Sequence, residues 1–359
     1  MKKTVKRWMA ACSVLSLTGI LLAGCGSTSA PTNAGGTTAG QPAAASPANG
    51  SAKTMRIGIG LNDKSTEYKG TVKFKELAEK YTNGSVQVQL YPSGQLGADL
   101  NMTQQLQTGT LECTIPSTSP VANIIPEYAV YDLPFMFKDE KVADKVLDGP
   151  FGQKLLDKLP ASGIVGLGYW ENGFRDLTNS KRAIKTSADL SGIKLRVMQN
   201  PVHIDFWKAL GANPTPMSFD QVFNALQQHV IDGQENPVQT IYTQKMYEVQ
   251  KYMTISHHVY TPFVFLVSKI WWDQLTPDQQ QALKKAEKEA GDYQRQINRE
   301  EAKTDVDAIK QKGVEVNTLT DDARKEMEAK VKPVVDKYAA KYGDTVKQLF
   351  DEIKKAEAK

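Results

Sequence analysis

The sequence has 359 residues, of which 40% are hydrophobic and 23% charged, a composition typical of a globular protein rather than a fibrous or low-complexity chain. Its formal net charge of +4 comes entirely from four basic residues before Cys25, because 40 basic and 40 acidic residues remain after them. A neutral chain without a basic stripe interleaved with aromatic residues argues against nucleic acid as a partner.

The first 25 residues have the pattern of a bacterial signal peptide. Basic residues come first, and the apolar run 8–23 that follows is too short to span a membrane. Leu22-Ala23-Gly24-Cys25 matches the lipobox, after which the cysteine becomes the lipidated N-terminal residue. We therefore predict a signal peptide over 1–24 and a lipid anchor on Cys25 that holds the mature protein to the cell membrane on its extracytoplasmic side. An ordinary secretory signal with an incidental cysteine is the alternative.

Residues 26–53 contain no aromatic and no branched aliphatic side chain, so they cannot bury a core. We expect residues 25–53 to comprise the lipidated cysteine and a disordered tether. The cysteines fit this division, because Cys12 lies in the leader, Cys25 carries the lipid and only Cys113 remains for the folded part. A single thiol excludes an internal disulfide, and Cys113 is interpreted as a buried apolar residue.

From residue 54 onward, strand-like and helix-like patterns alternate, which predicts an α/β fold. Strands are expected at 55–61, 85–91, 163–170, 181–184 and 193–197, and helices at 65–81, 98–107, 201–210 and 219–228. The segment 257–268 looks like a strand that leaves one sheet and enters another at Pro262, and 232–237 looks like a tight polar loop. About 300 residues is the size at which two cores form instead of one.

A long helix is predicted from Thr276, which is a good N-cap followed by proline and by the capping-box residue Gln279. Apolar residues then recur at spacings of three and four as far as Gln311, so an unbroken helix would be about 50 Å long and would outrun one domain. Two packed helices with a kink near Arg299 are the alternative. From Thr320 the chain has the pattern of an exposed, Lys/Glu-rich helical cover.

Arg196 is the side chain that points most directly to a function. It lies in the predicted strand 193–197 between apolar neighbours, where a charge that cannot be lost needs either a buried acid or a transient anion. No acidic residue lies nearby in the sequence. The guanidinium offers two parallel donors to a carboxylate, and Arg175, just after a strand, can offer more.

Catalytic and metal-binding patterns are absent from the sequence. There is no GxSxG, HExxH, GxxxxGK[ST] or CxxC motif, and the glycines at 163, 166 and 168 lack the order of a dinucleotide-binding loop. Glu235 has no paired nucleophile or second acid, and the four histidines are isolated or adjacent on one strand. We therefore expect a protein that is not an enzyme and that uses no metal and no cofactor.

Several motifs together resemble the solute-binding subunit of TRAP (tripartite ATP-independent periplasmic) transporters. They are LRV at 195–197, GANPTPMSF at 211–219, DGQENP at 232–237, YPSGQLGADLNMTQQLQTGTL at 91–111 and YDLPFMF at 131–137. The resemblance covers nearly everything after residue 54 and implies a two-domain, periplasmic-binding-protein-like α/β fold with a central ligand cleft and a long helix spanning both domains. Domain I would comprise 54–172 and 262–300, and domain II would comprise 173–261 and 301–329. Residues 330–359 would form a separate C-terminal helical segment.

The resemblance also implies the ligand contacts. The arginine matching Arg196 clamps the ligand carboxylate, the one matching Arg175 assists, and the ring of Phe219 lies on the carbon skeleton of the ligand. For each arginine the alternative is a structural ion pair with an acid of its domain. Gln199 is added because it lies three residues beyond Arg196 and reaches the same region. The whole expected ligand-binding set is Arg196, Arg175, Asn236, Phe219, Gln199, Glu67, Asp99, Ser117 and Phe263.

Departures from the sialic-acid-binding branch of that family narrow the ligand class. Gly60 and Phe263 stand in place of polar contacts of that branch, and Ser117 stands in place of an acid. We expect a sugar acid such as a hexuronate, or else a C4-dicarboxylate, and Gln199 and Asn236 favour the former because they offer partners to hydroxyl groups. The protein would deliver this acid to the membrane subunits of a TRAP permease. The alternatives are an ABC-type or chemoreceptor-type binding protein for an organic anion, or a secreted hydrolase.

Overall fold

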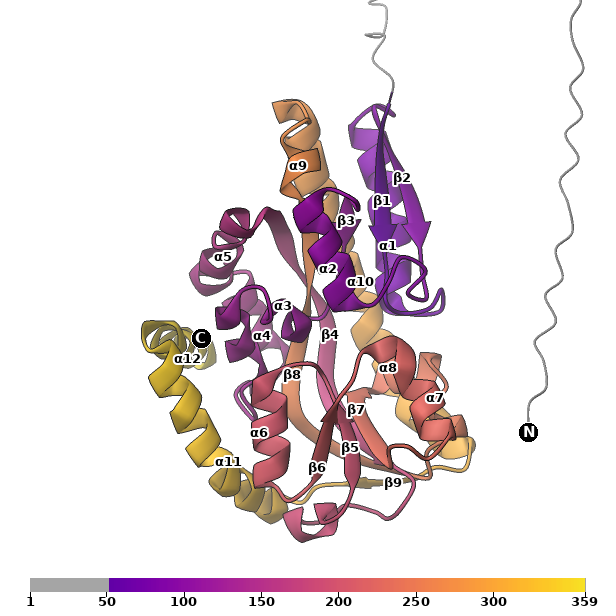
Figure 1. Cartoon of the computed structure of the whole chain (residues 1–359), viewed down its shortest axis with the longest axis vertical. Coiled ribbons are helices and arrows are strands. Elements are labelled where there is room, and N and C mark those ends of the chain that lie inside the picture. The colour runs from indigo at the N-terminus through magenta and orange to yellow at the C-terminus, as the bar shows by residue number, and fades with distance from the viewer. Residues whose placement is uncertain (1–51, 359) are drawn as a thin grey trace, which may run out of the picture. The chain divides into compact units, whose positions relative to one another are not determined.

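The computed structural model describes residues 52–358, which form an α/β unit built on a mixed sheet (Figure 1). Within this range nine strands belong to the sheet, in the order β2-β1-β3-β8-β4-β7-β5-β6, with β9 paired to β8. Their bounds are β1 (Lys53–Gly58), β2 (Val86–Tyr91), β3 (Cys113–Thr114), β4 (Ile164–Asn179), β5 (Lys194–Val197), β6 (Asn213–Pro216), β7 (Gly233–Pro237), β8 (Tyr252–Ser268) and β9 (Glu315–Thr318). The neighbours β1, β2 and β3 are parallel, as are β5, β6 and β7, whereas β8 and β4 are antiparallel to each other and to β3 and β7 beside them.

The long strands β4 and β8 run through both halves of this sheet, with the half built on β1–β3 at one end and the half built on β5–β7 at the other (Figure 1). Their register shifts at three places, between Gly166 and Gly168, between Glu171 and Gly173, and between Arg175 and Leu177. Gly173 has a φ of 118°, which a residue with a Cβ rarely adopts, so glycine is needed at the second of these shifts. The regular ladder is therefore interrupted between the two halves.

Helices join the strands and bury their apolar sides against the sheet. Their bounds are α1 (Thr66–Tyr81), α2 (Asp99–Thr108), α3 (Thr118–Val121), α4 (Glu140–Leu147), α5 (Pro150–Leu156), α6 (Pro201–Ala209), α7 (Val222–Gln227), α8 (Val238–Thr243), α9 (Lys269–Trp272), α10 (Pro277–Gln311), α11 (Asp321–Tyr342) and α12 (Asp344–Glu357), with 3-10 helices η1 (Pro126–Asp132), η2 (Leu159–Ser162), η3 (Ser187–Leu190), η4 (Phe219–Gln221) and η5 (Met246–Glu248). The helices predicted at 65–81, 98–107 and 201–210 are confirmed to within one residue at each end as α1, α2 and α6. The helix predicted at 219–228 is divided into η4 and α7.

Helix α10 is one unbroken helix of 35 residues, which confirms the long helix predicted from Thr276 and rules out the kinked alternative. Thr276 and Gln279 form the expected capping box, with hydrogen bonds of 3.0 and 3.2 Å. At 1.5 Å per residue the helix is about 52 Å long, so it packs on α1 in one half and on α8 and β9 in the other (Figure 1). Along this course Arg295 donates to both carboxylate oxygens of Asp148, at 2.7 and 2.8 Å.

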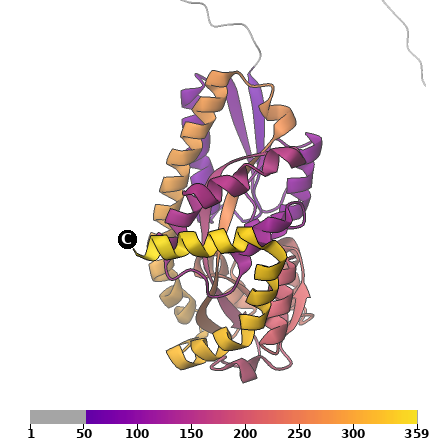
Figure 2. The same cartoon turned by 90° about the vertical axis from the view of Figure 1, so that its left-hand side faces the viewer.

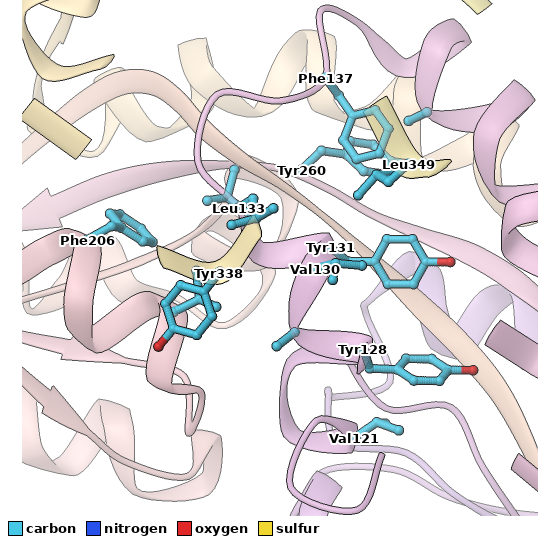
Figure 3. Packing of buried hydrophobic residues seen from close by; sticks show 14 of the residues in the cluster. Val121, Tyr128, Val130, Tyr131, Leu133, Phe137, Phe206, Tyr260, Tyr338 and Leu349 are labelled. Atoms are coloured by element: carbon cyan, nitrogen blue, oxygen red, sulfur yellow. The ribbon is translucent and has the colours of Figure 1, made fainter. Parts of the chain in front are cut away.

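The C-terminal helices bury apolar faces in addition to exposing their charged ones. Figure 3 shows Leu349 of α12 beside the rings of Phe137 and Tyr260, whose centroids are 5.7 Å apart, within the largest hydrophobic cluster of the described chain. Figure 2 shows α12 crossing the side of the unit, where it packs on α4 and α5, and Lys145 of α4 donates to the backbone oxygen of Ala356 at 2.9 Å. Residues 321–357 are therefore an integral part of the fold.

Two predicted segments have a different structure. Residues 232–237 do not form a loop, because Gly233–Pro237 is the fully buried strand β7, whose backbone pairs with β4. Residues 181–184 are not a strand, because the side-chain oxygen of Asn179 accepts the N–H groups of Lys181 and Arg182, at 2.8 and 2.9 Å, and closes a turn.

The strands predicted at 163–170 and 257–268 are parts of the longer strands β4 and β8, and 257–268 stays within one sheet. Pro262 lies opposite Glu171, beside the register shift between Glu171 and Gly173, which is a position where a strand tolerates proline. Among residues 52–358, no helix is long and apolar enough to cross a membrane.

Candidate functional site

Residues from both halves of the sheet line one cavity, whose empty volume, counted to its open mouth, is about 530 Å³. The half built on β1–β3 contributes the loop after β1 and the starts of α1 and α2, and the other half contributes the end of β5, η4 and β7. The lining residues are Gly60, Leu61, Glu67, Ala98, Asp99, Ser117, Pro120, Asn172, Arg196, Met198, Gln199, Ser218, Phe219, Asn236 and Phe263. Apolar side chains with a few charged and polar groups converging among them are the lining typical of a small-molecule site.

The fold brings together eight of the nine side chains that the sequence predicts to bind ligand. The eight that line the cavity are Arg196, Asn236, Phe219, Gln199, Glu67, Asp99, Ser117 and Phe263. The ninth, Arg175, is fully buried and does not line it. Ligand contact by these eight side chains stays a prediction. It requires that they line the same cavity, and they do.

Arg196 reaches the cavity from β5 and is only 3% exposed. Its Nε donates to the backbone oxygen of Met217 at 2.9 Å, and its guanidinium carbon lies 5.9 Å from the centre of the Phe219 ring, within the range of a cation–π contact. Its Nη1 is buried and has no hydrogen-bond partner among residues 52–358. Because a buried charged donor without a partner is costly, this arrangement suits an anion that enters the cavity.

Arg175, in contrast, has an internal acid as its partner. Its Nε and Nη2 donate to the two carboxylate oxygens of Glu235 at 2.5 and 2.9 Å, and both side chains are completely buried. Nη2 also donates to Oδ1 of Asn236 at 3.1 Å, so Arg175 fixes the orientation of an amide that lines the cavity. Its Nη1 is buried without a hydrogen-bond partner in the part of the chain that the structure describes. Direct contact between Arg175 and a ligand therefore stays a prediction, whereas its contact with Glu235 and Asn236 is observed.

The charges around the two arginines leave one positive charge without a paired acid in the described chain. Burial alone would raise the pKa of Glu235, but Arg175 and the hydrogen bond with His258, at 3.0 Å, hold it well below its usual range, so Glu235 is ionised. Burial lowers the pKa of His258 to about 4, so its ring is neutral at pH 7. Glu235 thus balances Arg175. Burial also lowers the pKa of Arg196 to about 10, with Glu235 opposing and Arg175 adding to the change, so Arg196 is still charged at neutral pH.

The half built on β1–β3 contributes two acids to the cavity. Glu67, in the first turn of α1, is 1% exposed, and within residues 52–358 no hydrogen bond of normal geometry reaches either of its carboxylate oxygens. Burial and the nearby Asp99 raise the pKa of Glu67 well above its usual range, and the Leu61 amide opposes part of this rise. Asp99 is half-buried at the start of α2, and its Oδ2 accepts the N–H of Ser117 at 3.1 Å. Burial raises the pKa of Asp99 to about 6, although this hydrogen bond and Arg196 oppose the rise.

Sequence reasoning missed several residues that line the cavity, chief among them Asn172, whose Nδ2 donates to Oγ of Ser117 at 3.1 Å. A usable signal was present, because the polar pair Glu171-Asn172 directly follows the apolar run 163–170. Met198 was also missed. It follows Arg196 by two residues, and in an extended chain residues at this spacing point to the same face. No group of three or more His, Cys, Asp or Glu side chains in residues 52–358 is placed to hold a metal ion.

Comparisons with known proteins agree with this fold and cavity. A family model described as bacterial extracellular solute-binding protein, family 7 (DctP), matches residues 57–341. The C4-dicarboxylate-binding periplasmic protein DctP of Rhodobacter capsulatus is 40% identical over 277 residues, which are 77% of this chain and 83% of the relative.

Two solved structures extend the likeness to three dimensions. The sugar acid binding protein from Advenella mimigardefordensis in complex with galactonate is 46% identical, with a TM-score of 0.83, and the match covers 85% of this chain and 99% of that one. A TRAP periplasmic solute binding protein from Polaromonas sp. JS666 bound to D-erythronate is 35% identical, with a TM-score of 0.81, and the match covers 83% of this chain and 98% of that one. The chain thus belongs to the DctP family of bacterial extracellular solute-binding proteins and has the two-domain α/β fold of the solute-binding proteins of TRAP transporters.

Proposed function

We propose that this protein captures a small organic acid in the cavity through Arg196 and delivers it to the membrane subunits of a TRAP permease. The observation that carries the proposal is the state of Arg196, a buried and charged side chain that lines the cavity and has an unsatisfied nitrogen. A ligand carboxylate accepts parallel N–H groups from one guanidinium, so it supplies both the charge and the hydrogen bonds that this arginine lacks. Family membership supports binding and delivery rather than catalysis.

Sugar acids and C4-dicarboxylates are the two ligand classes that the relatives suggest, since those relatives carry galactonate or D-erythronate or are named for C4-dicarboxylates. The lining of the cavity favours a sugar acid, such as a hexuronate or an aldonate. Ser117, Asn172 and Gln199 can exchange hydrogen bonds with hydroxyl groups, and the rings of Phe219 and Phe263 can cover the carbon skeleton.

We propose that two domains close around the ligand, with 54–172 and 262–300 in one and 173–261 and 301–329 in the other. The interrupted ladder of β4 and β8 supports a hinge between them. Among the hydrogen bonds that join the two domains, two lie beside the cavity. Asn123 donates to the backbone oxygen of Gln199 at 2.7 Å, and Asn62 donates to that of Thr243 at 2.8 Å. Opening would break these bonds, so the permease can distinguish the closed, loaded shape from the open one.

We further propose that the protein acts outside the cytoplasm, anchored to the cell membrane through a lipid on Cys25 after removal of residues 1–24. These residues, and the tether that follows as far as residue 51, lie outside the described part of the chain, so this proposal rests on the sequence pattern. The extracellular description of the family is consistent with it.

A thermal-shift screen of the purified protein with galactonate, D-erythronate, D-glucuronate and succinate tests the proposed function. An acid present at 100 times its Kd should stabilise the folded protein by about 2.7 kcal/mol. The Arg196→Ala variant should lose this response at the same ligand concentration. The matched control is Arg182→Ala, which removes an exposed arginine that does not line the cavity and should respond like the parent. The proposal is wrong if no organic acid stabilises the parent, or if Arg196→Ala responds as the parent does.

A further inference from the structure

The two halves of the sheet bring groups of opposite charge to the cavity. Arg196, from the half built on β5–β7, offers donors, whereas Glu67, from the half built on β1–β3, offers two carboxylate oxygens that no hydrogen bond of normal geometry from residues 52–358 reaches. Asp99 lies near Glu67 and, within the same range, accepts a hydrogen bond only at Oδ2, from the N–H of Ser117. A buried carboxyl group without well-placed partners costs free energy, so the carboxyl group of Glu67 and Oδ1 of Asp99 suit hydrogen-bond partners that a ligand or water can bring.

Gly60 keeps the acidic pair accessible. A Cβ at position 60 would lie 2.7 Å from Oδ1 of Asp99, closer than real Cβ contacts allow, so any side chain there would displace or cover this oxygen. The backbone at Gly60 is not in the left-handed region, so glycine serves to leave space here and not to permit a special φ. Oδ1 of Asp99 therefore stays open to a group that occupies the cavity.

We propose, resting on the proposed organic-acid function, that Glu67 and Asp99 form a hydroxyl-binding pair that admits monocarboxylic polyhydroxy acids and rejects dicarboxylates of the same length. A ligand hydroxyl donates one hydrogen bond and accepts others, so it can form hydrogen bonds with both acids. A second ligand carboxylate only accepts hydrogen bonds, and it would bring a negative charge against the ionised Asp99, which is strongly unfavourable in a buried site.

The ionisation of the two acids fits this selectivity. Burial and mutual repulsion favour the protonated form of Glu67, which then donates an O–H as well as accepting hydrogen bonds. Asp99, with its pKa raised by burial to about 6, is mostly ionised at pH 7.5 and acts as an acceptor. The other charged groups acting on Asp99 are Arg196, which opposes the rise in its pKa, and Asp220, which adds to the negative potential. Together the pair offers a polyol both a donor and an acceptor while keeping a negative charge.

Matched pairs of acids test the selectivity directly. Galactonate and galactarate differ only at C6, which carries a hydroxyl in the first and a carboxylate in the second, and D-erythronate and meso-tartrate differ in the same way at C4. In calorimetric titrations at pH 7.5, the dicarboxylate of each pair should bind the parent at least about 100-fold more weakly, which corresponds to about 2.7 kcal/mol. Succinate should bind as weakly as meso-tartrate or more weakly, because it has no hydroxyl groups.

Two isosteric changes should relax the selectivity. Glu67→Gln and Asp99→Asn keep the size and the hydrogen-bonding capacity of each side chain but remove the ionisable group. In the double variant the preference for the monocarboxylate should fall by about 10-fold or more. The matched control is Glu287→Gln, which changes another buried glutamate, outside the cavity, and leaves an oxygen to accept the hydrogen bond that Trp170 donates at 3.0 Å. This control should keep the selectivity of the parent.

The outcomes separate this proposal from the function on which it rests. If either dicarboxylate binds the parent as tightly as its matched monocarboxylate, the proposal is overturned. It is also overturned if the folded double variant keeps the full preference, with folding judged from its melting curve. The proposed function fails in a different way, namely if the parent binds none of these acids or if Arg196→Ala binds them as tightly as the parent.

Discussion

Replacing Arg175 by alanine leaves the Glu235 carboxylate fully buried, with His258 as its remaining side-chain partner. Removing one partner of a buried ion pair typically costs about 3 to 5 kcal/mol, because the other charge stays in a medium that solvates it poorly. At about 2 to 4 °C per kcal/mol, the Tm of the unliganded protein should fall by about 6 to 20 °C. The double variant Arg175→Ala/Glu235→Gln should recover part of this loss, because it also removes the unbalanced charge.

Replacing Arg196 by alanine should have the opposite pattern of effects. Among the described residues, its side chain makes one hydrogen bond, to the backbone oxygen of Met217, and pairs with no acid, so no buried carboxylate loses its partner. The Tm without ligand should therefore change by only a few degrees. Affinity should fall instead, because loss of one partner of a buried charged contact costs about 2 to 5 kcal/mol, or roughly 30-fold to several thousand-fold. Arg196→Lys should recover only part of the loss, since an ammonium group lacks the planar fork.

Melting curves without ligand and calorimetric titrations with galactonate, measured on both alanine variants, decide the matter. Arg182→Ala serves again as the control for removal of an exposed arginine. The reasoning is refuted if the unliganded Arg196→Ala variant melts far below the parent while Arg175→Ala does not. It is refuted equally if Arg196→Ala binds galactonate as tightly as the parent. In either case the assignment of Glu235 to Arg175, and of the ligand to Arg196, would be wrong.

Saturating ligand should reduce the radius of gyration in solution scattering, since the two halves close about β4 and β8, and an unchanged radius would indicate a rigid body. Cys25→Ser should move the protein from the membrane fraction to the soluble fraction without lowering its Tm, whereas a variant that still pellets with membranes would contradict the lipid anchor. Gly291→Ala should destabilise the protein by about 1 to 3 kcal/mol despite its better helix propensity, because the new Cβ would lie 2.7 Å from Nε1 of Trp170, and a higher Tm would contradict this. Burial lowers the pKa of His258 to about 4 in the folded protein, below the ordinary value of 6.5, so this residue contributes stability at neutral pH that is lost as the pH falls from 6.5 towards 4. Between pH 7 and pH 5 the parent should therefore lose about 2 kcal/mol more than His258→Gln in urea unfolding, and equal losses would count against this role.

Local signals predicted the helices well, because a cap and an apolar period act within a few residues of one another. Ser65 and Thr276 begin α1 and α10 where their sequences indicate, and both side chains make the expected capping bonds. Local signals of this kind do not predict which strands pair. Gly233 and Pro237 are typical of turns and so predict a loop where β7 lies, whereas the pairing of β7 with β4 depends on residues about 60 positions earlier in the chain.

The same distinction between local signals and long-range pairing applies to the residues of the site. Arg196 stands out in the sequence because an arginine among apolar strand residues is locally anomalous. Motif resemblance predicts six further lining residues, and the spacing of Gln199 from Arg196 predicts that it lines the cavity too. The partner of Arg175 did not stand out, since the register that sets Leu177 opposite Glu235 brings the acid to the arginine only in the folded sheet. From the sequence alone, alanine at either arginine is expected to leave the protein folded, and it is this pairing that changes the expectation for Arg175.

The two strands that cross between the halves also constrain the order in which the chain can fold. Cys113 of β3 pairs with Val267 of β8, so the half built on β1–β3 cannot be completed until the chain as far as β8 and α10 has been synthesised. Closing so long a loop is entropically costly, and folds dominated by such distant pairings form slowly. A nascent chain of this protein is therefore unable to lock its N-terminal half early. Late completion of this half suits export of the chain, because a secretion channel needs an unfolded substrate.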